Sequence, residues 1–268
     1  MSSLWDREQH VLETVGSGLL PESAVISNSA SSLVFLHTRR DNCVRTVHNQ
    51  TMERIEEFLK ASELCDFDSC AAVRKRASDL GQGCTDNQQR LQRVYEFVRE
   101  LPYGLEDWDV KASETLRKGW GMCSGKTNLL VAMLRALSVP ARYRVFKIKA
   151  ERRLLKQVIG QNRAVADQFG NLPPVQDHVQ CEVYLGGWRV FDPSRDTGFE
   201  NGLRKLGIPL ERIPVADAQG AVHYEIMASI DEWARARQNS RKVRDDRELV
   251  FARVNVELDK VRRLGRRP

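Results

Sequence analysis

The chain has 268 residues, of which 41% are hydrophobic, 29% charged and 7% aromatic, as is typical of a globular protein with a substantial core. Its 17 glycines and 6 cysteines exclude collagen-like and disulfide-dense classes, and the regular recurrence of apolar residues excludes disorder for most of the chain. The net charge of +6 is uneven, because residues 231–268 hold twelve basic and seven acidic side chains. The basic charge therefore belongs to the C-terminal segment, and the rest is nearly neutral.

Nothing in the N-terminal residues resembles a secretory signal, since no positive segment is followed by an apolar stretch. The longest apolar run, residues 129–137, is interrupted by Arg135 and is shorter than the about 20 residues of a membrane helix. We therefore expect a cytoplasmic protein without membrane contact, whose cysteines are reduced. Because no Cys-x-x-Cys pair occurs and the five histidines are scattered, we expect neither a metal nor a cofactor.

Helical patterns dominate the first half of the chain. Residues 31–38 fit either a buried strand or a short helix, and helical spacing of apolar residues begins at Thr51. We predict a helix over 69–80 and a second that is capped by Thr85 or Asp86. The next helices are expected over 112–118 and from 123 to 137.

Strand patterns follow. Residues 141–149 and 179–185 are predicted strands, and a two-residue Gly186-Gly187 turn joins the second to a partner over 188–191. The order of helices and then an antiparallel sheet defines an α+β fold. We divide the chain into a mostly helical extension (1–84), a central α+β core (85–230) and a basic amphipathic C-terminal helix (231–268).

Gly125-Lys126-Thr127 at a predicted helix start is similar to the end of a phosphate-binding loop. That motif needs a glycine where this chain has Trp120, and it follows a strand, whereas this segment follows a helix. The pattern therefore disfavours nucleotide binding.

Cys123 begins the same helix, where unpaired N–H groups and the helix dipole favour a thiolate. Gly119, Gly121 and Gly125 permit a tight backbone and a close approach by a substrate carbonyl, and the Cys123 N–H would face the growing oxyanion. A cysteine in this position is also compatible with an inert, packed residue. The hairpin decides between the two readings, because it brings His178 and Asp192 together and so completes a nucleophile, a base and an orienting carboxylate.

These motifs resemble the transglutaminase-like superfamily. Gly-Met-Cys precedes a helix that ends in Leu-Ser-Val-Pro-Ala-Arg, and the strand from His178, the Gly187-Trp188 pair and Asp192-Pro193 follow in the family's order. The likeness extends from Asp86 to Asp196, and more weakly over 58–80. It implies a papain-like α+β core in which Cys123 is the nucleophile, His178 the general base and acid, and Asp192 the residue that orients the imidazole.

The chain also departs from this family. Many members have a tryptophan where this chain has Gln180, which shares the His178 face of the strand, whereas Cys181 is expected in the core. The second oxyanion donor is left open among Tyr103, Trp108 and Trp120. The long polar segment 151–177 is a candidate lid or substrate-selecting flap.

The resemblance implies a thioester on Cys123, formed from a small-molecule, peptide or carrier-protein-bound acyl donor. Water as acceptor would make the protein a protease or amidase, and an amine would make it a transamidase or amide synthase, so both reactions stay open. The alternatives are an amide synthase that uses an acidic carrier protein docked on the basic tail, and a non-catalytic binding protein on the same fold.

The C-terminal segment has an apolar stripe at helical spacing, and its charges of both signs are interleaved. The stripe consists of Val243, Val250, Val254, Leu258 and Val261. A helix that packs on its own core, or on a second copy in a homo-oligomer, explains this pattern without nucleic acid.

Overall fold

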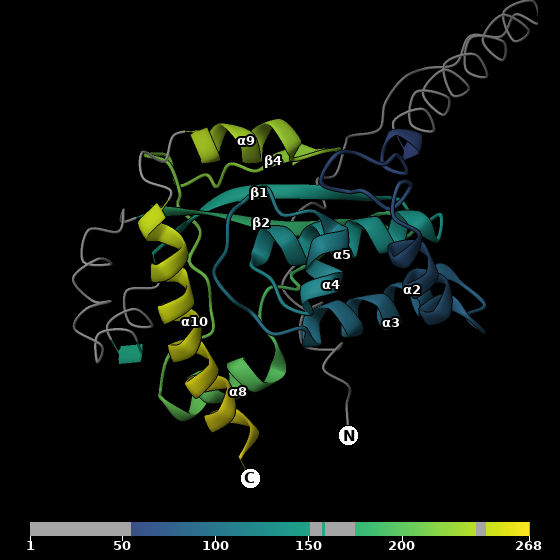
Figure 1. Ribbon diagram of the computed structural model, residues 1–268. Coiled ribbons are helices and arrows are strands. Elements are labelled where there is room, and N and C mark those ends of the chain that lie inside the picture. The colour runs from purple at the N-terminus through teal and green to yellow at the C-terminus, as the bar shows by residue number, and fades with distance from the viewer. Residues whose placement is uncertain (1–54, 151–156, 159–174, 240–244, 268) are drawn as a thin grey trace, which may run out of the picture. The chain divides into compact units, whose positions relative to one another are not determined.

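The computed structural model describes residues 55–150, 157–158, 175–239 and 245–267 (Figure 1). Contacts divide the chain into residues 1–49 and 50–268, and every element described here lies in the second unit. The predicted element at 31–38 and the polar segment up to residue 174, apart from 157–158, lie outside the described residues. The three-part division of the chain stays a prediction.

The helices ahead of the sheet follow the predicted order. They are α2 (Ala71–Gly81), α3 (Asn87–Glu100), α4 (Ala112–Lys118) and α5 (Cys123–Ala136). Asp86 caps α3, because its carboxylate accepts a hydrogen bond from the Gln89 N–H at 2.8 Å. Gly119 ends α4 with a φ of 71°, a left-handed conformation that glycine adopts without strain.

The sheet is antiparallel, with strand order β3-β2-β1-β4. Its strands are β1 (Ala141–Lys149), β2 (Val175–Tyr184), β3 (Trp188–Phe191) and β4 (Glu225–Met227). Two predictions need correction. β2 begins at Val175, so residues 175–177 belong to the strand and not to a flap. The turn is also longer than predicted: Tyr184 pairs with Trp188, which leaves a three-residue turn in which Gly186 takes a φ of 76°.

Helix α5 is the centre of the core, and α3, α4 and α5 lie on one side of the sheet in Figure 1. Every residue of α5 from Cys123 to Arg135 is buried, as expected for a helix that is covered on all sides. Cys181 of β2 is fully buried, which confirms its predicted place in the core. The arrangement confirms the predicted α+β class.

The C-terminal half adds α8 (Thr197–Lys205), α9 (Asp231–Asn239) and α10 (Asp245–Arg266), and α10 crosses α8 (Figure 1). Val254, Leu258 and Val261 of α10 pack with Phe199 and Leu203 of α8. This part of the predicted stripe therefore covers the chain's own core, and association of two copies through it stays an untested prediction. None of the helices within the described residues is long and apolar enough to cross a bilayer.

Candidate active site

Three elements bring the predicted site residues to one region. Cys123 is the first residue of α5, His178 lies inside β2, and Asp192 directly follows β3. Because Cys181 pairs with Phe191, Asp192 emerges beside Gln180, which shares a strand face with His178. The register of this hairpin is therefore what joins the histidine to the carboxylate.

His178 and Asp192 form a direct pair. The Nε2 atom of His178 lies 2.8 Å from Oδ2 of Asp192, and His178 is only 2% exposed. The Phe146 ring packs edge-on against the imidazole, with ring centroids 5.4 Å apart. The imidazole is thus fixed both by an ionic partner and by an aromatic neighbour.

Asp192 accepts hydrogen bonds from further donors, and of these Arg212 could not be predicted from the sequence. Its Oδ2 accepts from Nη1 of Arg212 at 2.6 Å and from Nε2 of Gln180 at 3.3 Å. Its Oδ1 accepts from the Ser194 N–H at 3.0 Å and from the Ser194 hydroxyl at 2.5 Å. Burial alone would raise the pKa of Asp192, but the Arg212 cation, His178 and Ser194 together hold it well below its usual range. The carboxylate is therefore ionised at neutral pH.

Cys123 begins α5 where this helix packs against β2. One turn further along α5, the Thr127 hydroxyl donates to the carbonyl of Val179, the residue after His178, at 3.3 Å. Cys123 is 6% exposed, and burial raises the pKa of its thiol to about 12, against the opposing effects of the Val179 N–H and the Arg212 cation. The expectation of a thiolate at this helix start was thus wrong for the resting site, because burial outweighs the helix terminus.

The loop before Cys123 is held by a buried carboxylate. Oε1 of Glu106 accepts from the Met122 N–H at 2.9 Å, and Lys118 pairs with the other oxygen. A Cβ on Gly125 would lie only 2.4 Å from that Oε1, which explains the glycine. Glu106 lies in a coil without a recognisable pattern, so the sequence offered no signal for it.

Lys126, the lysine of the phosphate-loop-like motif, is fully buried in this fold. Its ammonium donates to the carbonyls of Arg99, Leu101 and Ser194 at 2.9, 2.6 and 3.2 Å. Burial lowers its pKa to about 7. The Lys126 side chain therefore links the end of α3 to the segment after Asp192. The motif begins a helix that does not follow a strand, so it does not form a phosphate-binding loop.

Each aromatic candidate for a second oxyanion donor packs against another side chain. The Tyr103 ring stacks on Phe199 at 5.9 Å between centroids, and Trp108 packs edge-on against Trp233 at 5.1 Å. The ammonium of Lys118 lies 4.5 Å from the centre of the Trp120 ring. The choice of a second oxyanion donor among the three stays open. Gln180, on the strand face that was predicted for it, donates to Asp192.

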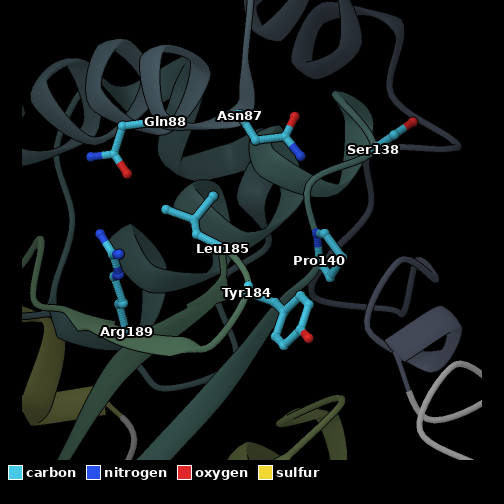
Figure 2. Close-up of a pocket in the computed structure, with 8 residues that line it drawn as sticks. Asn87, Gln88, Ser138, Pro140, Tyr184, Leu185 and Arg189 are labelled. Atoms are coloured by element: carbon cyan, nitrogen blue, oxygen red, sulfur yellow. The ribbon is translucent and has the colours of Figure 1, made fainter. Parts of the chain in front are cut away.

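An open pocket of about 590 Å³ lies away from this site (Figure 2). The start of α3, the residues after α5 and the β2–β3 turn line it; they include Asn87, Gln88, Ser138, Pro140, Tyr184, Leu185 and Arg189. Ser138 follows α5, so the pocket is about 20 Å along the helix from Cys123. Within the described ranges, no cluster of three or more histidine, cysteine, aspartate or glutamate residues could hold a metal ion.

Comparison with family models gives one match. Residues 74–193 match the model of the Transglutaminase-like superfamily, a range that includes Cys123, His178 and Asp192. The match covers less than half of the chain, and it agrees with the resemblance that the motifs predicted. A search of curated proteins found no match.

Two solved structures match part of the chain. A "putative cysteine protease" from Cytophaga hutchinsonii is 22% identical with a TM-score of 0.41, and the match covers 66% of this chain and 52% of that protein. A "putative protease" from Parabacteroides distasonis is 14% identical with a TM-score of 0.33, and the match covers 50% of this chain and 26% of that protein. The chain thus spans about half of the first protein and about a quarter of the second.

Proposed function

We propose that this protein is a cysteine-dependent acyl-transfer enzyme with Cys123 as nucleophile, His178 as general base and acid, and Asp192 as orienting carboxylate. The observation that carries the proposal is the 2.8 Å pair between His178 and Asp192 beside a thiol that lies against Val179. A nucleophile, a base and an orienting group in that order are the requirements of nucleophilic acyl transfer.

In this proposal the protons balance through His178. Because Asp192 binds Nε2, His178 exchanges the Cys123 proton through Nδ1. The sulfur then attacks the acyl carbonyl, the carbon–leaving-group bond breaks, and the imidazolium returns the proton to the leaving group. The thioester passes its acyl group to water or to an amine, whose proton His178 takes up and returns to the sulfur. Backbone N–H groups at the start of α5 are suited to stabilise the oxyanion.

The test is acylation of Cys123 by p-nitrophenyl acetate. The reference variant replaces Cys43, Cys70 and Cys84 with alanine, so that none of these three thiols can react. Cys70 and Cys84 are the cysteines of the described residues that are not buried, and Cys43 lies outside those residues. We expect a burst of nitrophenolate and an acetyl adduct on Cys123 by peptide mass, both absent in Cys123→Ala. Asp192→Asn should slow the burst by about 100-fold or more, because the amide favours the wrong imidazole tautomer.

Competition between water and hydroxylamine for the acyl-enzyme then separates hydrolysis from transfer to amines. Donors presented as a small thioester, a peptide amide and a carrier-protein thioester identify the class of acyl group. Acylation of Cys123 no faster than that of a free thiol, unchanged in His178→Ala, would leave only a binding role on this fold.

A further inference from the structure

The C-terminal helix α10 holds the backbone segment that runs beside the loop of the candidate nucleophile. Oδ1 of Asn255 accepts from the Leu105 N–H at 2.6 Å, and its Nδ2 donates to the Leu105 carbonyl at 3.0 Å. Nη2 of Arg262 donates to the Tyr103 carbonyl at 2.7 Å. Asn255 and Arg262 of α10 therefore hydrogen-bond the backbone of Leu105 and Tyr103, which are alternate residues of the segment 103–105.

Arg262 also reaches the segment that follows the candidate orienting carboxylate. Its Nε lies 3.0 Å from both carboxylate oxygens of Asp196, four residues after Asp192. Asp196 in turn accepts from the Tyr103 N–H and from the Phe199 N–H, each at 3.0 Å. Arg262 is 4% exposed and Asp196 1% exposed, so this ion pair is buried and well supplied with hydrogen bonds.

The held segment leads directly to Cys123. The Gly104 N–H donates to the Gly121 carbonyl at 3.2 Å, and the Gly121 N–H donates to the Pro102 carbonyl at 3.1 Å. Gly121 lies only two residues before Cys123. The contacts thus continue from α10, through 102–105, to the loop that sets the position of the sulfur.

We infer that Arg262 and Asn255 are positioning residues of the active site, acting through Tyr103, Leu105 and Asp196. The inference rests on the proposed function, and it assigns the site a part of the chain beyond residue 193, where the family match ends. Arg262 fixes the nucleophile loop and the Asp192 segment with one guanidinium. The C-terminal helix, whose charge first suggested a docking tail, is thereby part of the catalytic framework.

The experiment compares Arg262→Met and Asn255→Leu with Arg263→Met, a matched control at the exposed neighbouring position. In the Arg262 and Asn255 variants, we expect the p-nitrophenyl acetate burst at Cys123 to slow by about 10- to 100-fold, since small displacements of reacting groups carry penalties of this size. Amide hydrogen exchange at Gly104 and Gly121 should accelerate while α5 stays protected. Arg262→Lys should restore only part of the rate, because a single ammonium cannot replace the forked contacts.

The acylation rate and the amide exchange together distinguish failure of the positioning role of α10 from failure of the proposed function. Unchanged acylation and unchanged exchange at Gly104 and Gly121 in a folded Arg262→Met variant would overturn the inference. Equal loss in Arg263→Met would also overturn it, because the effect would then be one of charge alone. An unreactive Cys123 in the unmodified chain counts against the proposed function, and the exchange data then still decide whether α10 holds the loop.

Discussion

At the candidate site, two neighbouring groups are driven toward opposite protonation states. Donors from Arg212, His178 and Ser194 keep Asp192 ionised, whereas burial keeps the Cys123 thiol protonated. Such a resting pair has a neutral nucleophile and a charged orienting group. Reaction therefore depends on proton transfer to His178 in the attacking step, and a standing thiolate contributes little.

This dependence gives a pH prediction for His178→Ala. A thiol with a pKa of about 12 loses its proton only as the pH rises, so acylation of this variant should increase about tenfold per pH unit between pH 7 and 10. The unmodified site should show a shallower profile, because His178 accepts the proton. Stopped-flow measurement of nitrophenolate release checks both profiles. A plateau of the variant near pH 8.5 would show that burial does not retain the thiol proton.

Lys126 provides a second prediction at this scale. Lys126→Met leaves three buried carbonyls without their donor, so we expect the free energy of unfolding to fall by about 1–3 kcal/mol. Lys147→Met, at an exposed position of β1, is the matched control and should be near neutral. Urea denaturation of both variants measures the difference.

The lowered pKa of Lys126 determines how the stability difference between the unmodified chain and Lys126→Met changes with pH. The folded chain holds Lys126 near a pKa of about 7, and the unfolded chain near about 10.4. Unfolding therefore takes up a proton between these values, and the stability of the unmodified chain relative to Lys126→Met should increase from pH 7 to pH 10. A flat difference across this range would mean that Lys126 stays charged in the fold.

At the scale of elements, the crossing of α8 and α10 depends on close backbone approach. A Cβ on Gly202 would lie 2.1 Å from the Val261 carbonyl oxygen, which cannot move without displacing α10. On Gly198 it would meet only arginine side chains, at 3.1 Å or more. We expect Gly202→Ala to cost about 1–3 kcal/mol and Gly198→Ala much less, as measured by urea denaturation. Equal effects would show that the crossing adapts to the added methyl group.

The elements also show which information the sequence contains. Helical period and capping residues predicted α3, α4 and α5, because those signals lie within a few residues of each other. Strand alternation predicted the faces of Gln180 and Cys181 in the same way, although the turn beside them was assigned one residue too few. Glu106 and Arg212 were not predicted, because each lies in a coil and meets its partner only through long-range packing. A local pattern cannot report such a contact.

At the scale of the whole molecule, the basic C-terminal segment has an internal role. Arg262 is buried against Asp196, and Lys260 pairs with Glu257 at 2.9 Å, so part of the segment's charge is balanced within the fold. The apolar stripe is likewise used, since Leu258 is 2% exposed within the α8–α10 cluster. Net charge and amphipathicity here reflect the packing of one chain, and they do not by themselves indicate a polyanion or a second copy.

Two substitutions on α10 separate internal packing from association between chains. Leu258→Ala should lower the free energy of unfolding by about 2–5 kcal/mol, because it leaves a cavity between α8 and α10, without changing the mass in solution. Val256 is 53% exposed on the same helix, so Val256→Arg should change neither stability nor mass. Urea denaturation and sedimentation equilibrium measure the two quantities. A dimeric mass that Val256→Arg converts to a monomer would instead show that the outer face of α10 joins two copies while its inner face supports the site.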